Sequence, residues 1–262
     1  MSGQDDYIEV NRAAWNLRTE IHVASDFYDM PGFKAGATSL KPFELRLLGD
    51  VTGRSVLHLQ CHFGQDTLSL SRMGAKVTGV DFSDAALQVA QETADELGLS
   101  AQFVLSDVLK LDLGKTVDTV FASYGVLGWL PDVAAWMQVA ARHLPRGGEL
   151  VLVEFHPLIW LFDQNAPVDY FHSSEPDVET QTGSYTDGGK DVDITSCYWD
   201  HTLSDVLEAL RSGGFELTLF EEYDHSPYPL AGMVERAPGE FVLEDRIQQR
   251  LPHCYALRAR KL

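Results

Sequence analysis

Side chains that could bind a nucleoside cofactor follow short apolar runs of this sequence. Asp81 and Asp107 each come within two residues of the end of such a run. The first carboxylate could accept hydrogen bonds from both ribose hydroxyls and the second from an adenine amino group, while Phe82 could cover the adenine face. Either aspartate could instead only cap the helix that follows it. His156, after a further apolar run, could accept a proton from a substrate at neutral pH.

These side chains come together only if the apolar runs are neighbouring strands. Five short apolar runs alternate with three stretches of helical periodicity, which predicts a parallel sheet with crossover helices. Because an open parallel sheet binds its ligand at the carboxyl ends of its strands, the polar residues after the runs are predicted to line one site. The runs are 56–59, 76–80, 102–105, 117–122 and 149–155, and the helical stretches are 66–73, 83–97 and 131–144.

The chain has additions before and within this pattern. Apolar residues repeat at helical spacing over 7–21, with Tyr7, Val10, Ala14, Leu17 and Ile21 on one predicted face. The segment 157–200 breaks the strand–helix rhythm and is rich in polar and aromatic residues, with a predicted hairpin turn at 187–190. We therefore predict one domain, composed of an N-terminal helical cap (1–50), a cofactor-binding core (51–156), an inserted substrate lid (157–200) and a C-terminal helix with two strands (201–262).

Composition narrows the class of protein. The 262 residues include 20 Lys and Arg against 39 Asp and Glu, a formal net charge of −19. Such a chain has little positive charge with which to neutralise phosphates, so nucleic acid and anionic membranes are not expected as partners. The three cysteines are widely spaced, the N-terminus is acidic, and no apolar run is long enough for a membrane helix. We expect a cytoplasmic monomer or homodimer without a bound metal.

Four stretches of the sequence resemble motifs of the class I S-adenosylmethionine-dependent methyltransferases. The resemblance is good over about residues 50–155 and extends to the last helix and strands. It implies a Rossmann-like, doubly wound α/β fold with a seven-stranded sheet, mostly parallel with one antiparallel strand, and S-adenosylmethionine as the cofactor. In many small-molecule enzymes of this family a segment before the first strand folds over the cofactor, which implies contacts from Tyr28 and Ser39. The similar stretches are 56–64, 79–83, 106–108 and 144–150, and the last strands are 215–223 and 254–260.

The first of these motifs departs from the family pattern. His58 stands in place of the usual aspartate, and Gln60 and His62 stand where glycines are common, so that only Gly64 remains. Glycine in such a loop allows positive φ and a close approach of the backbone to the cofactor. The side chains of Gln60, His62 and Gln65 are therefore expected to supply hydrogen bonds that backbone amides give elsewhere in the family.

The leading hypothesis is an enzyme that transfers a methyl group from S-adenosylmethionine to a small-molecule acceptor by in-line displacement, leaving S-adenosylhomocysteine. Two alternatives stay open: a nicotinamide-dependent oxidoreductase, which the glycine-poor loop disfavours, and a non-catalytic S-adenosylmethionine-binding module. The catalytic candidates are His156, Tyr124 and His201. The cofactor-binding candidates are Tyr28, Ser39, Gln60, His62, Gly64, Asp81, Phe82, Asp107, Val108 and Ser123.

Overall fold

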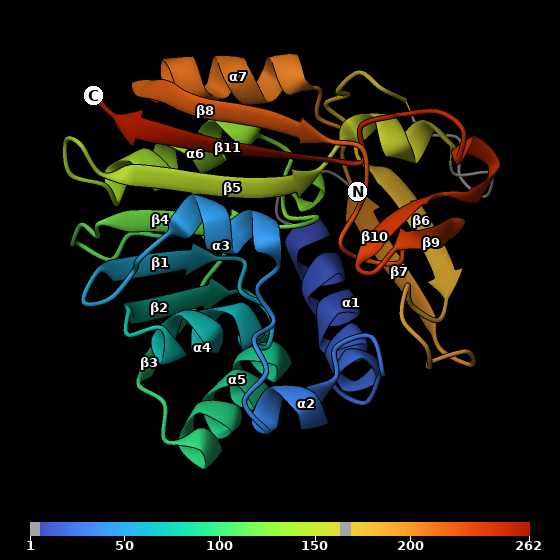
Figure 1. Cartoon of the computed structure of the whole chain (residues 1–262), viewed down its shortest axis with the longest axis horizontal. Coiled ribbons are helices and arrows are strands. Elements are labelled where there is room, and N and C mark those ends of the chain that lie inside the picture. The colour runs from blue at the N-terminus through green and yellow to red at the C-terminus, as the bar shows by residue number, and fades with distance from the viewer. Residues whose placement is uncertain (1–5, 163–168) are drawn as a thin grey trace.

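The computed structural model describes residues 6–162 and 169–262, and its centre is a seven-stranded sheet (Figure 1). The strand order is β3-β2-β1-β4-β5-β11-β8, in which β1 to β5 are parallel and β11 runs antiparallel to both of its neighbours. The predicted fold class is therefore confirmed. The strands are β1 Ser55–Leu59, β2 Lys76–Asp81, β3 Ala101–Leu105, β4 Thr119–Ser123, β5 Glu149–Phe155, β8 Phe215–Tyr223 and β11 Cys254–Lys261.

The helices begin and end where the sequence offers caps. The Ser83 hydroxyl accepts from the Ala86 amide at the start of α5, and Gly98 ends this helix in the left-handed conformation. Thr202 and Asp205 form a reciprocal capping box at the start of α7. The α-helices are α1 Asp6–Val23, α2 Met30–Lys34, α3 Pro42–Leu48, α4 Gln65–Arg72, α5 Asp84–Leu97, α6 Val133–Arg142 and α7 Leu203–Ser212, and the 3₁₀ turns are η1 Val108–Lys110, η2 Leu127–Trp129, η3 Pro157–Phe162 and η4 Glu244–Arg246.

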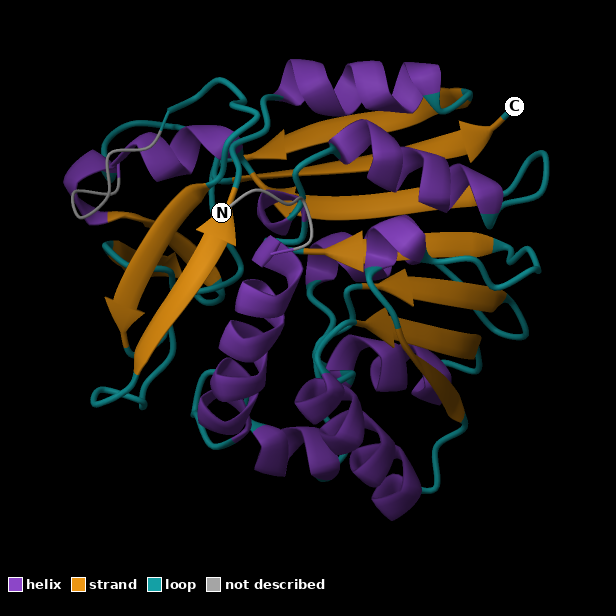
Figure 2. Cartoon of the chain, turned by 180° about the vertical axis from the view of Figure 1, so that it is seen from behind, coloured by secondary structure: helices purple, strands orange, loops and turns teal. Residues whose placement is uncertain are grey.

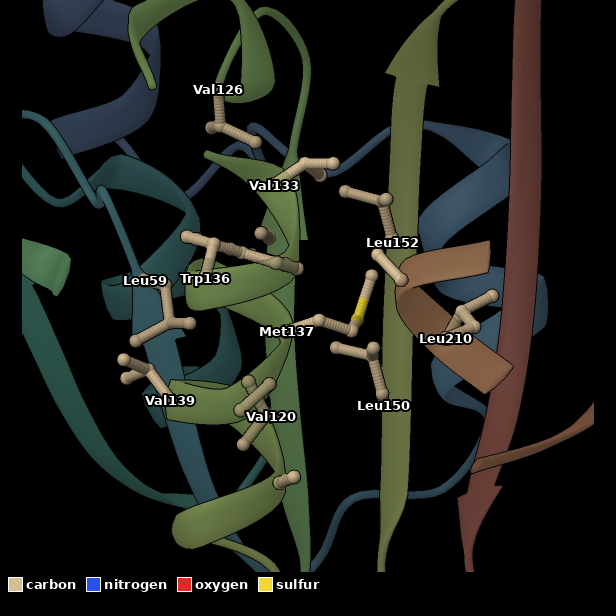
Figure 3. Packing of buried hydrophobic residues seen from close by; sticks show 14 of the residues in the cluster. Leu59, Val120, Val126, Val133, Trp136, Met137, Val139, Leu150, Leu152 and Leu210 are labelled. Carbon is tan, nitrogen blue, oxygen red and sulfur yellow. The ribbon is translucent and has the colours of Figure 1, made fainter. Parts of the chain in front are cut away.

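The sheet separates two apolar layers, as β4 illustrates. Val120 and Ala122 point into the cluster formed with α6 and α7, whereas Phe121 points into the cluster formed with α3. Figure 3 shows Trp136 and Met137 of α6 packed against the first of these faces. Each fully buried side chain of this size contributes roughly 1.5–3 kcal/mol relative to an exposed one. This burial fixes the carboxyl ends of the strands relative to one another.

Two hairpins lie beyond the carboxyl ends of the parallel strands, together with α1 (Figures 1 and 2). The first pairs β6 (Asp177–Thr182) with β7 (Asp193–Tyr198), and the predicted turn lies inside its connection. The second pairs β9 (Met233–Ala237) with β10 (Glu240–Leu243), and sequence analysis did not find it. The amide group of Asn11 on α1 donates to the Cys197 carbonyl and accepts from the Cys197 amide, both at 2.8 Å. The first hairpin is thereby joined to α1.

A helix can cross a membrane only if it is both long and apolar. Within residues 6–162 and 169–262, no helix combines the length and the apolar composition that crossing a membrane requires.

Candidate functional site

A cavity of about 900 Å³ lies at the carboxyl ends of β1, β2, β4 and β5. Its floor is formed by the residues that follow these strands. Its walls come from α1 and from residues within 179–201 and 228–231. An open α/β sheet binds ligands at this edge. Of the predicted site residues, those that line the cavity are Tyr28, Ser39, Gln60, His62, Gly64, Asp81, Phe82, Ser123, Tyr124 and His201.

The loop after β1 adopts a glycine-like backbone although two of its residues are not glycine. Gln60 has φ of 53°, His62 has φ of 51° and Gly64 has φ of 79°. Positive φ is strained for residues other than glycine, by about 1–2 kcal/mol each. At Gly64 an added Cβ would also lie 2.9 Å from the Cβ of Ala90. The loop therefore keeps the path that glycines would give it, at a cost in strain.

Both polar atoms of the Gln60 side-chain amide form hydrogen bonds within the protein. Its amide nitrogen donates to the Val126 carbonyl at 2.8 Å, and its amide oxygen accepts from the indole of Trp136 at 2.9 Å. Gln65 likewise donates to the carbonyl of Tyr28 at 2.8 Å. The expectation that these two amides bind the cofactor is therefore not supported by their contacts.

His62 keeps a free polar atom at the cavity wall. Its backbone amide donates to Asp81 at 2.8 Å, and its ring lies 5.0 Å from that of Trp15, centroid to centroid. Its Nε2 atom is buried and has no hydrogen-bond partner among the described residues. Burial lowers the pKa of this imidazole well below its usual value, so the ring is neutral. A neutral ring nitrogen here can bind a ligand hydroxyl or amine.

Asp81 stands at the end of β2 with both carboxylate oxygens engaged. Oδ2 accepts from the His62 amide at 2.8 Å and Oδ1 accepts from the Ser83 amide at 2.9 Å. Burial raises the pKa of this carboxyl to about 6, against the lowering effect of these amides. Each carboxylate oxygen can accept a second hydrogen bond. Asp81 can therefore hold the loop after β1 and a ligand hydroxyl at the same time.

The aspartate that follows β3 has different surroundings from those of Asp81. Asp107 accepts from the Leu109 amide at 2.9 Å and caps the short turn η1, and its carboxylate lies 3.5 Å from the Lys110 ammonium. Val108 is buried in the core. Neither residue is among those that line the cavity. For Asp107 the structure thus supports the capping role rather than the predicted adenine contact, and Val108, a predicted cofactor-binding residue, lies in the core instead.

The three catalytic candidates have separate surroundings, and His156 lies outside the cavity wall. Its Nε2 lies 3.0 Å from Glu222 Oε1, and its Nδ1 accepts from the Leu158 amide at 3.1 Å. Its backbone amide continues the pairing of β5 with β11 by donating to the carbonyl of His253 at 2.9 Å. This placement turns the imidazole away from any substrate in the cavity, contrary to expectation.

His201 does line the cavity, but one of its nitrogens is occupied. Nε2 lies 2.7 Å from the Leu130 carbonyl oxygen, so this nitrogen carries the hydrogen. The ring stacks on His172 with centroids 4.8 Å apart. Burial lowers the pKa of His201, so the neutral form with a basic Nδ1 prevails.

Tyr124 is paired with a carboxyl group that sequence analysis missed. Its hydroxyl donates to Glu44 Oε2 at 2.9 Å, and its backbone has φ of 44°. Glu44 is fully buried in α3, and its Oε1 has no hydrogen-bond partner among the described residues. Burial and the charge of Asp66 raise the pKa of Glu44 to about 8. Asp66, which lines the cavity, accepts from Ser123 Oγ at 3.1 Å.

Tyr28 and Ser39, predicted to contact the cofactor, line the cavity from the N-terminal segment, and the hydroxyl group of each forms a hydrogen bond within the protein. The hydroxyl of Tyr28 bonds to that of Tyr185, and Ser39 Oγ lies 3.0 Å from Ser69 Oγ. The structure thus gathers side chains from both ends of the inserted segment and from the N-terminal cap around one space. Among the described residues no cluster of three potential metal ligands occurs.

The buried face of α1 carries a further functional candidate that sequence analysis missed. Asn11, Arg18 and His22 are buried at helical spacing, whereas Leu17 is 43% exposed. Arg18 lines the cavity. The predicted apolar face is therefore only partly correct: Ala14 on it is buried, but the buried side also carries polar residues, because it contacts the hairpin and the cavity rather than the core. The signal that could have found it is the recurrence of polar residues at the same spacing.

Residues 56–148 match a family model described as a methyltransferase domain. The demethylmenaquinone methyltransferase of Lactococcus lactis is 31% identical over 126 residues, which are 46% of this chain and 50% of that protein. The ubiquinone biosynthesis O-methyltransferase of Alkalilimnicola ehrlichii is 30% identical over 146 residues, 53% of this chain and 59% of that one. The chain thus spans little more than half the length of these relatives.

Solved structures are similar over nearly the whole chain. A structure titled as the DhpI–SAH complex has a TM-score of 0.61 at 17% identity and covers 99% of this chain and 98% of its own. An S-adenosylmethionine-dependent methyltransferase from Clostridium acetobutylicum has a TM-score of 0.59 at 15% identity, covering 96% and 98%. At such identities the likeness shows the fold. Together with the strand order, it shows that this chain has the fold of these methyltransferase structures, and residues 56–148 match a methyltransferase domain within that fold.

Proposed function

We propose that this protein transfers a methyl group from S-adenosylmethionine to a small-molecule acceptor. The observation that carries the proposal is the cavity, into which Asp81 projects from the end of β2 beside a loop with three positive φ angles. When bound, the cofactor supplies an electrophilic methyl group on a sulfonium. The names of the relatives, which refer to menaquinone and ubiquinone precursors, support an acceptor of small size.

The residues present fit such a cofactor. Asp81 has acceptor capacity for the ribose hydroxyls, and Phe82 beside it lines the same cavity. His62 Nε2 is a buried polar atom that awaits a partner, and Asp66 offers a carboxylate to the cofactor's amino group. Gly64 cannot carry a side chain without contact with Ala90. We assign these residues to the cofactor.

Tyr124 and Glu44 provide a route for the acceptor's proton. An acceptor oxygen or nitrogen that forms a bond to the methyl group must lose a proton. In our proposal this proton passes to the Tyr124 oxygen while the tyrosine's own proton passes to the ionised form of Glu44, whose carboxylate becomes a neutral carboxyl group. Because the pKa of Glu44 is raised to about 8, the ionised form is the minor one at neutral pH, and the rate of transfer should rise with pH up to about 8. The 2.9 Å hydrogen bond between Tyr124 and Glu44 supports this route. His201, with Nδ1 as the basic atom, is the second candidate.

Residues 157–200 are proposed to close the acceptor side. Trp160, Ser184, Tyr185 and Tyr198 from this segment line the cavity, and residues 163–168 lie outside the described part of the chain. The protein is further proposed to act in the cytoplasm on a small molecule rather than a nucleic acid, as a monomer or homodimer. Its charge of −19 argues against a nucleic-acid partner, and its three free, buried cysteines support a reducing compartment.

Calorimetric binding of S-adenosylhomocysteine tests the proposed cofactor. The parent protein should bind it, and Asp81→Asn should weaken binding about 10–100-fold, which corresponds to roughly 1.5–3 kcal/mol for a hydrogen bond to a charged group. Asp107→Asn is the matched control, because its carboxylate is outside the cavity wall. A parent protein that binds NADH but not S-adenosylhomocysteine would support the oxidoreductase alternative.

A methyl-transfer assay then separates an enzyme from a binding module. Labelled S-adenosylmethionine is incubated with a panel of phenols, quinols and amines, and incorporated label is counted. Transfer that Tyr124→Phe lowers by 10²-fold or more would support the proton route. If the protein binds the cofactor product but labels no acceptor in a broad panel, the non-catalytic alternative gains support.

A further inference from the structure

A buried guanidinium in the cavity wall has no ion-pair partner among the described residues. Arg18 on α1 is only 5% exposed and lines the cavity. Its Nη2 donates to the hydroxyl of Ser196 on β7 at 2.8 Å, and its Nη1 is buried without any hydrogen-bond partner among the described residues. No carboxylate in residues 6–162 or 169–262 forms an ion pair with it. The described part of the protein thus leaves Nη1, one of the two terminal guanidinium nitrogens, without a hydrogen-bond acceptor.

An unpaired buried charge is unusual because it is destabilising. Removing an ion from water costs several kcal/mol unless nearby opposite charges or hydrogen bonds compensate. Here compensation is partial, since Glu179 acts on Arg18 without forming an ion pair and the phenol of Tyr185, whose pKa is raised to about 12, is neutral. Burial lowers the pKa of the guanidinium, but arginine stays protonated at any physiological pH. A positive charge is therefore held in the wall of the cavity.

Two tryptophans keep this charge in place. The guanidinium carbon lies 5.5 Å from the ring centroid of Trp15 and 5.4 Å from that of Trp129, and the two rings meet edge to face at 5.2 Å. The cation–π contacts fix the plane of the guanidinium without offering it a hydrogen-bond acceptor. A planar fork with free donors is the group that binds carboxylate and phosphate oxygens in a bidentate manner.

We infer that Arg18 binds the anionic group of a ligand in this cavity, a carboxylate or phosphate whose oxygens complete the hydrogen bonds of the guanidinium. Two ligands could bring this group: the amino-acid carboxylate of the cofactor, or an acidic methyl acceptor. Trp129 follows β4 and Ser196 belongs to the inserted hairpin, whereas Trp15 also contacts His62 beside the proposed cofactor. The inference rests on the proposed function for the identity of both ligands, but not for the binding of an anion by Arg18.

The test compares three variants of the full chain. Arg18→Met removes the charge at similar volume, Arg18→Lys keeps the charge without the fork, and Arg12→Met removes an exposed arginine of the same helix that pairs with Glu9. Urea unfolding without ligand is measured first. Because the unpaired charge is destabilising, Arg18→Met should unfold at the same or a higher urea concentration than the parent. A guanidinium that only supports the fold would instead lower the midpoint when it is removed.

Two binding arms identify the source of the anion. In the first, calorimetry compares S-adenosylhomocysteine with 5′-methylthioadenosine, which lacks the amino-acid group. If the cofactor supplies the anion, Arg18→Met weakens the first ligand at least tenfold and leaves the second unchanged. In the second arm, benzoate and phenyl phosphate are titrated against benzamide, with and without the cofactor product, and tryptophan fluorescence is followed. If an acceptor supplies the anion, the charged probes bind and Arg18→Met abolishes their binding.

The inference is wrong if binding in neither arm depends on Arg18. In that case S-adenosylhomocysteine would bind equally tightly to all variants, and no charged probe would bind more tightly to the parent than to Arg18→Met. Equal losses in Arg12→Met would also overturn it, because they would reflect overall charge. Failure of the proposed function gives a different result: neither adenosine compound binds the parent, while the charged probes still report on Arg18.

Discussion

Replacing Gln60 by glycine and by alanine should separate two opposing effects at the loop after β1. Gln60 has φ of 53°, which glycine tolerates and other residues do not, yet its amide bridges Val126 and Trp136. Both substitutions remove this bridge, but only glycine removes the strain. We expect both variants to be less stable than the parent, with Gln60→Ala the less stable of the two.

The magnitudes follow from the contacts. Trp136 is fully buried, so its indole N–H loses its acceptor without access to water, which costs about 1–3 kcal/mol. The strain at positive φ is about 1–2 kcal/mol, and glycine loses part of this gain to its greater freedom in the unfolded chain, about 0.5–1 kcal/mol. The alanine variant should therefore fall below the glycine variant by about 1 kcal/mol. For a chain of this size that is a difference of roughly 2–4 °C in Tm.

Urea unfolding of the three proteins, monitored by tryptophan fluorescence and by circular dichroism, measures this difference. The two probes should give coincident transitions, so that a two-state free energy of unfolding is meaningful. An alanine variant that equals or exceeds the glycine variant in stability would refute the reasoning. So would a glycine variant about 1 kcal/mol more stable than the parent, because the relief of strain would then be unopposed and the bridge to Trp136 would contribute nothing.

Two further predictions concern ionisable groups. The folded-state pKa of Glu44, about 8, lies above its ordinary value of 4.5, so its contribution to stability is present at low pH and is lost as pH rises through 8. Glu44→Gln should flatten the fall in the parent's urea midpoint between pH 5 and pH 8; an unaltered slope would contradict this assignment. His156→Asn should leave the rate of methyl transfer within about threefold, since the ring faces Glu222, and a hundredfold loss would restore it as a base.

The sheet could be predicted from the sequence because its signals are local. Each strand is a short apolar run, and the helices have caps such as Ser83 and Thr202 that work through residues only three positions away. The end of β2 at Asp81 follows from the same pattern, and so does its place at the ligand-binding edge. The seven-stranded sheet with one antiparallel strand was implied by the family resemblance rather than by the spacing of these residues.

The parts that sequence analysis missed depend on contacts between distant segments. Glu44 resembles an ordinary exposed acid of a short helix, and only the packing of α3 on the sheet buries it next to Tyr124. His156 directly follows a strand, yet its direction is decided by the partner strand β11 and by Glu222. The hairpin of β9 and β10 has partly exposed strands with weak alternation, so its pattern is hard to distinguish from that of a loop.

The paired hydrogen bonds between Asn11 and Cys197 join two walls of the cavity, α1 and the hairpin of β6 and β7. A side-chain amide here takes the place of a neighbouring strand, since it satisfies both the N–H and the C=O of a residue in β7. A displacement of α1 away from the sheet therefore carries the first hairpin with it. If the cavity holds both reactants, one opening movement then exposes the methyl donor and the acceptor together. Cofactor and acceptor would therefore enter and leave the cavity in the same movement of α1 and the hairpin.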